Sequence, residues 1–183
     1  MFQSLSDTGD IAGKTALVRV DFNVPMDGGR ISDDTRLRAA LPTVNALREA
    51  GAKVALLAHF GRPKGERVPE MSLGPVAVEF GKVLGAPVAF APDCVGETAQ
   101  SAIDALPNGG VILLENTRYE AGETKGDAGL AAEMAKLGDL YVNDAFSAAH
   151  RDHVSSSKLA GLLPAYAGKA MERELNALEA ALG

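Results

Sequence analysis

Short apolar runs alternate along the chain with segments whose apolar residues recur every three or four positions. The apolar runs lie at 16–20, 54–58, 88–90, 111–114 and 140–142. Continuous apolar runs of this length are typical of strands that are buried on both faces of a sheet. The pattern therefore predicts five strands of a mainly parallel sheet.

The segments between these runs predict amphipathic helices. Their apolar stripes fall within 37–47, 73–83, 99–106 and 130–137, and a last stripe predicts a long helix over 169–182. Strands that alternate with such helices indicate an α/β fold, in which a parallel sheet has helices on both faces. We expect a three-layer, Rossmann-like domain.

Two local features modify this plan. Pro42 lies inside the first predicted helix and is expected to kink it there, because proline cannot donate a backbone hydrogen bond. The run Asp27-Gly28-Gly29 predicts a small hairpin turn beyond the first strand.

Polar and basic side chains follow four of the five predicted strands, where parallel strands bring them to one edge of the sheet. These residues are Asp21, Asn23 and Arg36, then His59 and Arg62, then Arg118, and finally His150 and Arg151. Two unit charges 4 Å apart interact by about 4 kcal/mol at an effective dielectric constant near 20, so converging guanidinium groups require an anion among them.

The kinds of side chain in this group narrow the ligand. Arginine binds phosphate and carboxylate through paired hydrogen bonds. Asp21 and Asn23 are better suited to a hydroxyl group. Together they predict a site for a small phosphorylated hydroxy acid.

Structural roles remain open for several of these residues. Any single arginine could instead be a solvated loop residue or pair with an acid such as Asp33 or Glu115. His59 is compatible with either a structural role or ligand contact. Asp21 could cap its own turn, and Asn143-Asp144 could serve only to form a turn.

Three further basic residues are expected outside the ligand site. Arg19 lies within a predicted strand and should pair with a nearby acid. Lys64 and His153 are expected on the surface.

Composition excludes several classes of function. The net charge of −6 argues against nucleic acid or an anionic membrane as the main partner. The single cysteine, Cys94, allows no internal disulfide and is expected in the core. The N-terminus lacks a signal-peptide pattern and no apolar run is long enough to span a bilayer, which together predict a cytoplasmic protein. The sequence has no nucleotide-binding P-loop, zinc-ligand spacing or serine-hydrolase elbow, so we expect no metal site on this chain.

Four motifs resemble the N-terminal domain of the phosphoglycerate kinase family. They are V-R-V-D-F-N-V-P at 18–25, A-H-F-G-R-P-K-G at 58–65, L-L-E-N-T-R-Y at 113–119 and Y-V-N-D-A-F-S-A-A-H-R at 141–151. Their order and spacing also match, and the resemblance covers essentially the whole chain.

The resemblance implies an enzyme that transfers a phosphoryl group between 1,3-bisphosphoglycerate and ADP, giving 3-phosphoglycerate and ATP in glycolysis. It implies substrate contacts from Asp21, Phe22, Asn23, Arg36, His59, Phe60, Gly61, Arg62, Arg118, His150 and Arg151. Among these, Arg36 is the implied catalytic residue, because its charge would stabilise the transferring phosphoryl group. His59, Arg62, Arg118 and Arg151 would bind the 3-phosphate or neighbouring oxygens.

The resemblance also implies a division of the molecule. Residues 1–168 would form the phosphoglycerate-binding domain and 169–183 the start of an interdomain helix. The nucleotide-binding domain, which would hold Mg-ATP or Mg-ADP, is expected to be absent, so this chain should bind no cofactor and be inactive alone. We expect a monomer that leaves an apolar strip exposed where the second domain would pack. The alternative is a non-catalytic anion-binding module.

Overall fold

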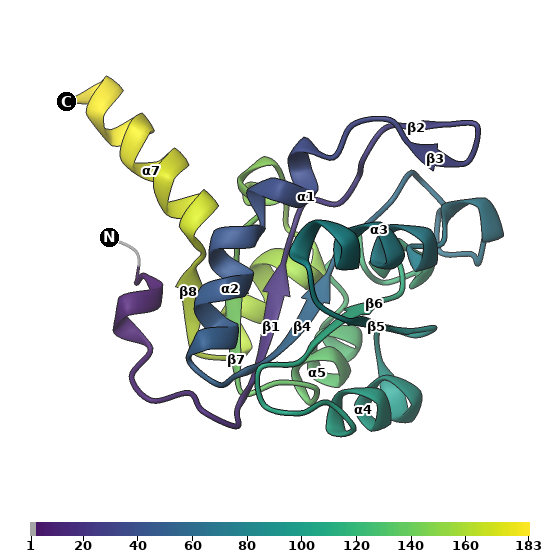
Figure 1. Ribbon diagram of the computed structural model, residues 1–183, viewed down its shortest axis with the longest axis horizontal. Helices are drawn as coiled ribbons and strands as arrows, with labels where there is room; N and C mark the ends of the chain where they lie inside the picture. Colours follow the sequence, from purple (N-terminus) through teal and green to yellow (C-terminus); the bar gives the residue numbers. More distant parts are fainter. Residues whose placement is uncertain (1–2) are drawn as a thin grey trace.

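The computed structural model describes residues 3–183, and a six-stranded sheet forms its centre (Figure 1). The order is β5-β6-β4-β1-β7-β8, and every neighbouring pair is parallel. The strands are β1 (Thr15–Arg19), β4 (Lys53–Leu57), β5 (Val88–Ala91), β6 (Val111–Leu114), β7 (Leu140–Asn143) and β8 (Ala165–Ala167). The five predicted strands and the α/β fold class are confirmed.

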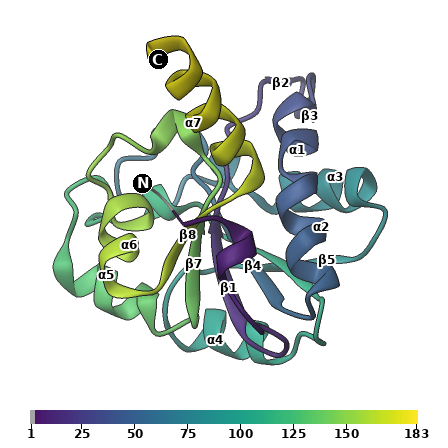
Figure 2. The same cartoon turned by 90° about the vertical axis from the view of Figure 1, so that its left-hand side faces the viewer.

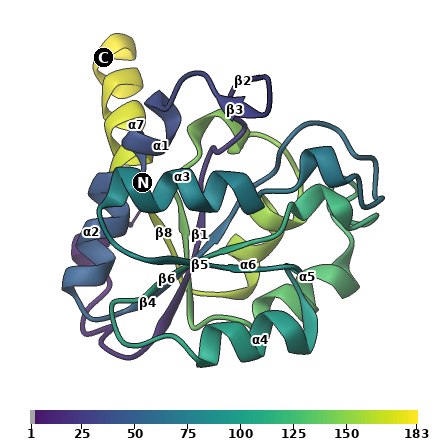
Figure 3. The same ribbon diagram turned by 45° about the vertical axis from the view of Figure 1, so that its right-hand side comes forward.

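Helices cover both faces of this sheet (Figure 3). One face carries α1 (Thr35–Ala39), α2 (Leu41–Glu49) and α3 (Gly74–Leu84), and the other carries α4 (Gly96–Asp104), α5 (Ala128–Ala135) and α6 (Leu159–Leu162). Successive side chains of a strand point to opposite faces, so Val18 joins the first core while Leu17 joins the second. Both cores are apolar, which explains why the strands read as continuous apolar runs.

Pro42 breaks its helix rather than bending it. The predicted helix is divided into α1 and α2 at Ala40, and Pro42 is the second residue of α2, where a missing N–H costs no helical hydrogen bond. The predicted hairpin is confirmed as β2 (Met26–Asp27) and β3 (Arg30–Ile31), joined through Gly28 and Gly29 at φ angles of 58° and 79°.

Several short elements were not predicted. They are the single turns of 3₁₀-helix η1 (Leu5–Asp7), η2 (Pro69–Met71), η3 (Thr117–Tyr119) and η4 (Phe146–Ala148), the π-helical turn η5 (Val154–Lys158) and the edge strand β8. β8 pairs with β7 on one side and makes only a single bridge, between Ala167 and Ser4, on the other, so it lacks the long apolar run of an interior strand.

The last helix, α7 (Lys169–Leu182), has the predicted bounds and projects from the body of the domain (Figures 1 and 2). Its first turn is anchored, because Met171 is buried and the Thr43 hydroxyl accepts a hydrogen bond from the Lys169 N–H at 2.7 Å. Further along, Leu178 and Leu182 are 48% and 81% exposed, which confirms the predicted apolar strip. No helix within residues 3–183 is long and apolar enough to cross a membrane.

Candidate anion-binding site

A cavity rich in positive charge lies at the carboxyl edge of the sheet. Its volume is about 450 Å³, and we call it the basic cavity. It is lined by Arg62, Lys64, Gly65, Arg118, Glu120, Ala121, Thr124, Lys125, Arg151 and His153. Three of the predicted arginines, from the loops that follow β4, β6 and β7, therefore meet at one place.

The positive charges of the basic cavity are not neutralised by the protein. Five lysine and arginine side chains face one carboxylate, that of Glu120. None of the five forms an ion pair at 4 Å or less with an acid among residues 3–183. The alternative in which Arg62, Arg118 and Arg151 pair with acids is therefore wrong, and the cavity is suited to an anion.

Arg118 shows the effect of this crowding most clearly. Burial lowers its pKa, and the charges of Arg151 and Arg19 lower it further. Its Nη1 donates to the carbonyl oxygen of Gly61 at 3.3 Å, but its Nε is buried and has no hydrogen-bond partner among the described residues. A buried donor without a partner costs about 1–3 kcal/mol, which an oxygen of a bound anion would recover.

The turn at Lys64 and Gly65 shapes one wall of the basic cavity. Lys64 has φ +59°, the only positive φ of a non-glycine residue in the described part of the chain, and Gly65 has φ +79°. A Cβ atom at Gly65 would lie 2.9 Å from the Cα of Ala121, so only glycine fits there. Lys64 is exposed and His153 is half-buried, so both lie at the surface as expected, but they line the cavity instead of lying outside it.

Asn116 holds two of the loops together, a role that the sequence did not reveal. Its side chain is fully buried and makes four hydrogen bonds. The Oδ1 atom accepts from the N–H groups of Phe60 and Arg118 at 3.2 and 3.0 Å, and Nδ2 donates to the carbonyl oxygens of Phe60 and Met71 at 2.7 and 3.0 Å. The loop after β4 is thereby fixed against the loop after β6.

His59 is held by a buried arginine. The Nη2 of Arg19 donates to its Nδ1 at 2.6 Å, so the structural alternative for His59 is confirmed at this nitrogen. Burial, together with the charges of Arg19, Arg118 and Arg151, lowers the pKa of His59 to about 3. Arg19 itself makes no direct ion pair with an acid within residues 3–183, contrary to expectation; its Nε instead donates to the Ser155 hydroxyl at 3.0 Å.

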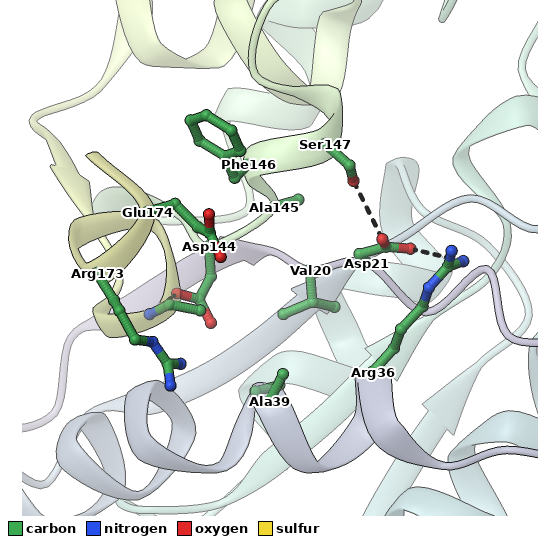
Figure 4. Close-up of a pocket in the computed structure, with 12 residues that line it drawn as sticks. Val20, Asp21, Arg36, Ala39, Asp144, Ala145, Phe146, Ser147, Arg173 and Glu174 are labelled. Carbon is green, nitrogen blue, oxygen red and sulfur yellow. Dashed lines mark hydrogen bonds and ion pairs between the residues drawn. The ribbon is translucent and has the colours of Figure 1, made fainter. Parts of the chain in front are cut away.

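Asp21 and Arg36 lie together in a second cavity of about 320 Å³, beside the first turn of α7 (Figure 4). We call it the α7 cavity. Arg36 lies 3.5 Å from the Asp21 carboxylate, which also accepts from the Ser147 hydroxyl at 3.0 Å. The same carboxylate accepts from the Asn23 N–H at 3.2 Å, which confirms that Asp21 caps its own turn. Arg36 does not line the basic cavity.

The remaining predicted residues occupy varied positions. The Phe22 side chain is fully buried with its ring 4.9 Å from that of Phe80, so only its backbone is available to a ligand. The Asn23 Oδ1 accepts from the Gly61 N–H at 3.0 Å and so joins the loops after β1 and β4. Phe60 and Gly61 are half-buried, and His150 is exposed and lines neither cavity.

Asn143 forms a turn, whereas Asp144 caps the last helix. The Asn143 Oδ1 accepts from the Ala145 N–H at 3.0 Å. The Asp144 carboxylate caps α7, since it accepts from the N–H of Ala170 at 2.9 Å. Burial raises the pKa of Asp144 to about 6, against hydrogen bonds from Thr43 and α7 that favour the charged form.

Asp144 should make the protein less stable as the pH rises from about 4 to about 6. Its ordinary pKa is 3.8, so in this window the folded state binds the proton more tightly than the unfolded state. We expect Asp144→Asn, which keeps an acceptor oxygen, to remove this fall and to raise the free energy of unfolding at pH 7 by about 2 kcal/mol. Urea unfolding from pH 4 to pH 8 measures both proteins; a constant difference between the two profiles would contradict the assignment.

The fold and the site define a class: a doubly wound α/β domain with an anion site at the carboxyl edge of its sheet. Residues 5–183 match the family model described as phosphoglycerate kinase. The chain belongs to the phosphoglycerate kinase family and corresponds to its N-terminal portion.

Individual relatives agree with this assignment. The chain is 67% identical over 177 residues to a phosphoglycerate kinase of Caulobacter sp. (strain K31), which covers 97% of this chain and 45% of the relative. It is 65% identical over 182 residues to that of Zymomonas mobilis, covering 100% and 46%. The chain thus spans about half the length of these curated relatives.

Solved structures show the same fold. The phosphoglycerate kinase of Coxiella burnetii superposes with a TM-score of 0.89 at 38% identity, over 99% of this chain and 45% of that one. The enzyme of Pyrococcus horikoshii gives a TM-score of 0.87 at 35% identity, over 98% and 45%.

Proposed function

We propose that this chain is the phosphoglycerate-binding half of a phosphoglycerate kinase. The reaction would be reversible phosphoryl transfer between 1,3-bisphosphoglycerate and ADP, giving 3-phosphoglycerate and ATP. The observation that carries the proposal is the basic cavity, in which five cationic side chains face one carboxylate in a protein of net charge −6. A small, highly charged anion would balance this excess of positive charge.

The proposed roles follow the two cavities. Arg62, Arg118 and Arg151 bind the 3-phosphate in the basic cavity. His59, which does not line this cavity, donates to a neighbouring oxygen. Asp21 and Asn23 then face the hydroxyl and carboxylate end of the substrate. Phe60, Gly61 and the Phe22 backbone shape the wall between these ends, and His150 makes an outer contact.

Arg36 has the proposed catalytic role, and the structure suggests how it is held ready. Its guanidinium is bound by the Asp21 carboxylate and by the carbonyl oxygen of Asn23, while its side chain remains 49% exposed. Positive charge placed there would neutralise the charge that develops on a transferring phosphoryl group. Positioning and charge neutralisation supply most of the catalysis in such reactions.

The other half of the active centre would come from a second domain. In this proposal residues 1–168 form the substrate domain and 169–183 begin an interdomain helix, whose exposed Leu178 and Leu182 would contact that domain. Mg-ATP and Mg-ADP are substrates held by the second domain, so the chain alone should be inactive. The whole protein would be a cytoplasmic, monomeric glycolytic enzyme.

Thermal melting with and without 3-phosphoglycerate tests the proposal. At a concentration 100 times its dissociation constant, a ligand that binds only the folded state stabilises it by about 2.7 kcal/mol. For a chain of this length that corresponds to an increase in Tm of about 5–10 °C. The shift should shrink in high salt, because the site is electrostatic.

The comparison with inorganic phosphate separates the proposal from its alternative. A phosphoglycerate site should give a larger shift with 3-phosphoglycerate than with the same concentration of phosphate. Equal shifts would favour a non-catalytic anion-binding module, and no shift at millimolar 3-phosphoglycerate would overturn the proposed function.

A further inference from the structure

We propose that Ser155 and Glu123 are positioning residues for the ligand site, and that they act through Arg19 to fix His59 in the tautomer with its proton on Nε2. This inference deepens the proposed function and rests on it for the identity of the ligand. Arg19, Ser155 and Glu123 do not line the basic cavity, and none of them was a candidate site residue.

A hydrogen-bonded chain of buried groups connects these residues. The Ser155 hydroxyl donates to the Glu123 Oε2 at 2.6 Å, and the Ser155 N–H donates to Oε1 at 2.8 Å. The same hydroxyl oxygen accepts from the Arg19 Nε at 3.0 Å. A hydroxyl that donates to a carboxylate and accepts from a guanidinium has a defined orientation, so Ser155 connects the two charges.

Ser155 is itself fixed in place. The Tyr141 hydroxyl donates to its carbonyl oxygen at 2.8 Å, and the adjacent Val154 N–H donates to the carbonyl oxygen of Glu123 at 3.0 Å. Ser155 and Glu123 are 0% and 1% exposed. The turn η5 is therefore attached to the strand β7 and to the segment that carries Glu123.

Arg19 then determines the state of His59. Arg19 is 1% exposed, and its Nη1 and Nη2 donate to the Val20 carbonyl oxygen at 2.5 Å and to the His59 Nδ1 at 2.6 Å. An arginine side chain has donors but no acceptor, so Nδ1 must be the unprotonated nitrogen of the ring. The ring proton is therefore on Nε2, where it is free to be donated.

Glu123 supplies the opposite charge that a buried arginine requires. Burial lowers the pKa of Arg19, and the strongest effect in the other direction comes from Glu123. Without that carboxylate, Arg19 would be a buried cation with no partner. Its guanidinium would then be expected to move toward water and away from His59.

The tautomer matters because the surroundings of His59 are already positive. The charged or titratable groups that act on it are Arg19 on β1, Arg118 on η3, and Arg151 and His153 before η5. A neutral ring with an Nε2–H donates a hydrogen bond to an anion without adding another repelling charge. The network would thus supply a neutral donor across the physiological pH range.

Nitrogen NMR on the wild-type chain tests the inference directly. The sequence contains three histidines, so their ring signals are readily separated. We expect His59 to show a protonated Nε2 and an unprotonated Nδ1, with no titration between pH 5 and pH 8 because its pKa is about 3. A proton on Nδ1, or titration near the ordinary value, would overturn the proposal whether or not any variant folds.

Two variants then test the supporting residues. Ser155→Ala removes the hydroxyl, and Glu123→Gln removes the charge while keeping its shape. In both we expect mixed His59 tautomers, a His59 pKa that moves up toward 6.5, and about tenfold weaker binding of 3-phosphoglycerate. The matched control is Ser157→Ala, which removes an exposed hydroxyl from the same turn and should leave His59 unchanged.

The two proposals fail in different ways. Variants that fold and keep both the His59 tautomer and wild-type affinity would refute the role of Ser155 and Glu123. A wild-type chain with the expected His59 signals but no affinity for 3-phosphoglycerate would refute the proposed function and leave the tautomer assignment standing.

Discussion

Arg118→Ala is expected to weaken 3-phosphoglycerate binding by about 100-fold without destabilising the unliganded protein. A hydrogen bond to a charged group contributes about 1.5–3 kcal/mol, and Arg118 can offer two such bonds to a phosphate. Among the described residues its guanidinium has one partner, the Gly61 carbonyl oxygen at 3.3 Å from Nη1, and its Nε has none. Its removal also relieves repulsion with Arg151, Arg19 and Arg62.

The two effects are measured separately. Urea unfolding without ligand should give a free energy equal to that of the wild type or up to about 1 kcal/mol higher. Titration calorimetry gives the loss of affinity. Arg38→Ala is the matched control, because it removes one positive charge from an exposed ion pair with Asp34 outside both cavities. Equal affinities in the two variants would show that the site responds only to net charge.

Asn116→Ala is expected to lower both stability and ligand binding. It would leave buried N–H and carbonyl groups of Phe60, Met71 and Arg118 without partners, and each such group costs about 1–3 kcal/mol. Allowing for local relaxation, we expect a loss of about 3 kcal/mol and a fall in Tm of about 6–12 °C. Binding should weaken because the loops after β4 and β6 lose their fixed separation.

Asn45→Ala is the control for this prediction. Asn45 lies on α2 and its side chain accepts one hydrogen bond, from the Arg48 Nη1 at 3.2 Å. Its removal should change the free energy of unfolding by less than about 1 kcal/mol. If the Tm of Asn116→Ala is no lower than that of Asn45→Ala, the Asn116 side chain does not hold the loops after β4 and β6 together.

The sequence was most informative where burial on both faces forces a simple pattern. β6 is buried along its whole length between two cores, so its apolar run predicted its bounds. The bounds of α7 were also predicted, from an apolar stripe at helical spacing. β8 was missed because an edge strand of three residues needs no such run.

The sequence predicted which charged side chains gather at the site but not which residues they contact. The carboxyl ends of parallel strands identified the edge and three of the arginines that meet in the basic cavity. The partners of Arg19 could not be predicted, because Ser155 lies 136 positions away and the link depends on the geometry of η5. The position of Lys64 and His153 in the cavity was not predicted for the same reason, since only the folded loops bring these surface residues there.

A crystal structure of the chain with 3-phosphoglycerate tests the central claim most directly. We expect the phosphate to lie in the basic cavity, within hydrogen-bond distance of the guanidinium groups of Arg62, Arg118 and Arg151. The carboxylate end should be directed toward Asp21 and Asn23. A phosphate bound in the α7 cavity instead, or a basic cavity without ligand at a saturating concentration, would contradict it.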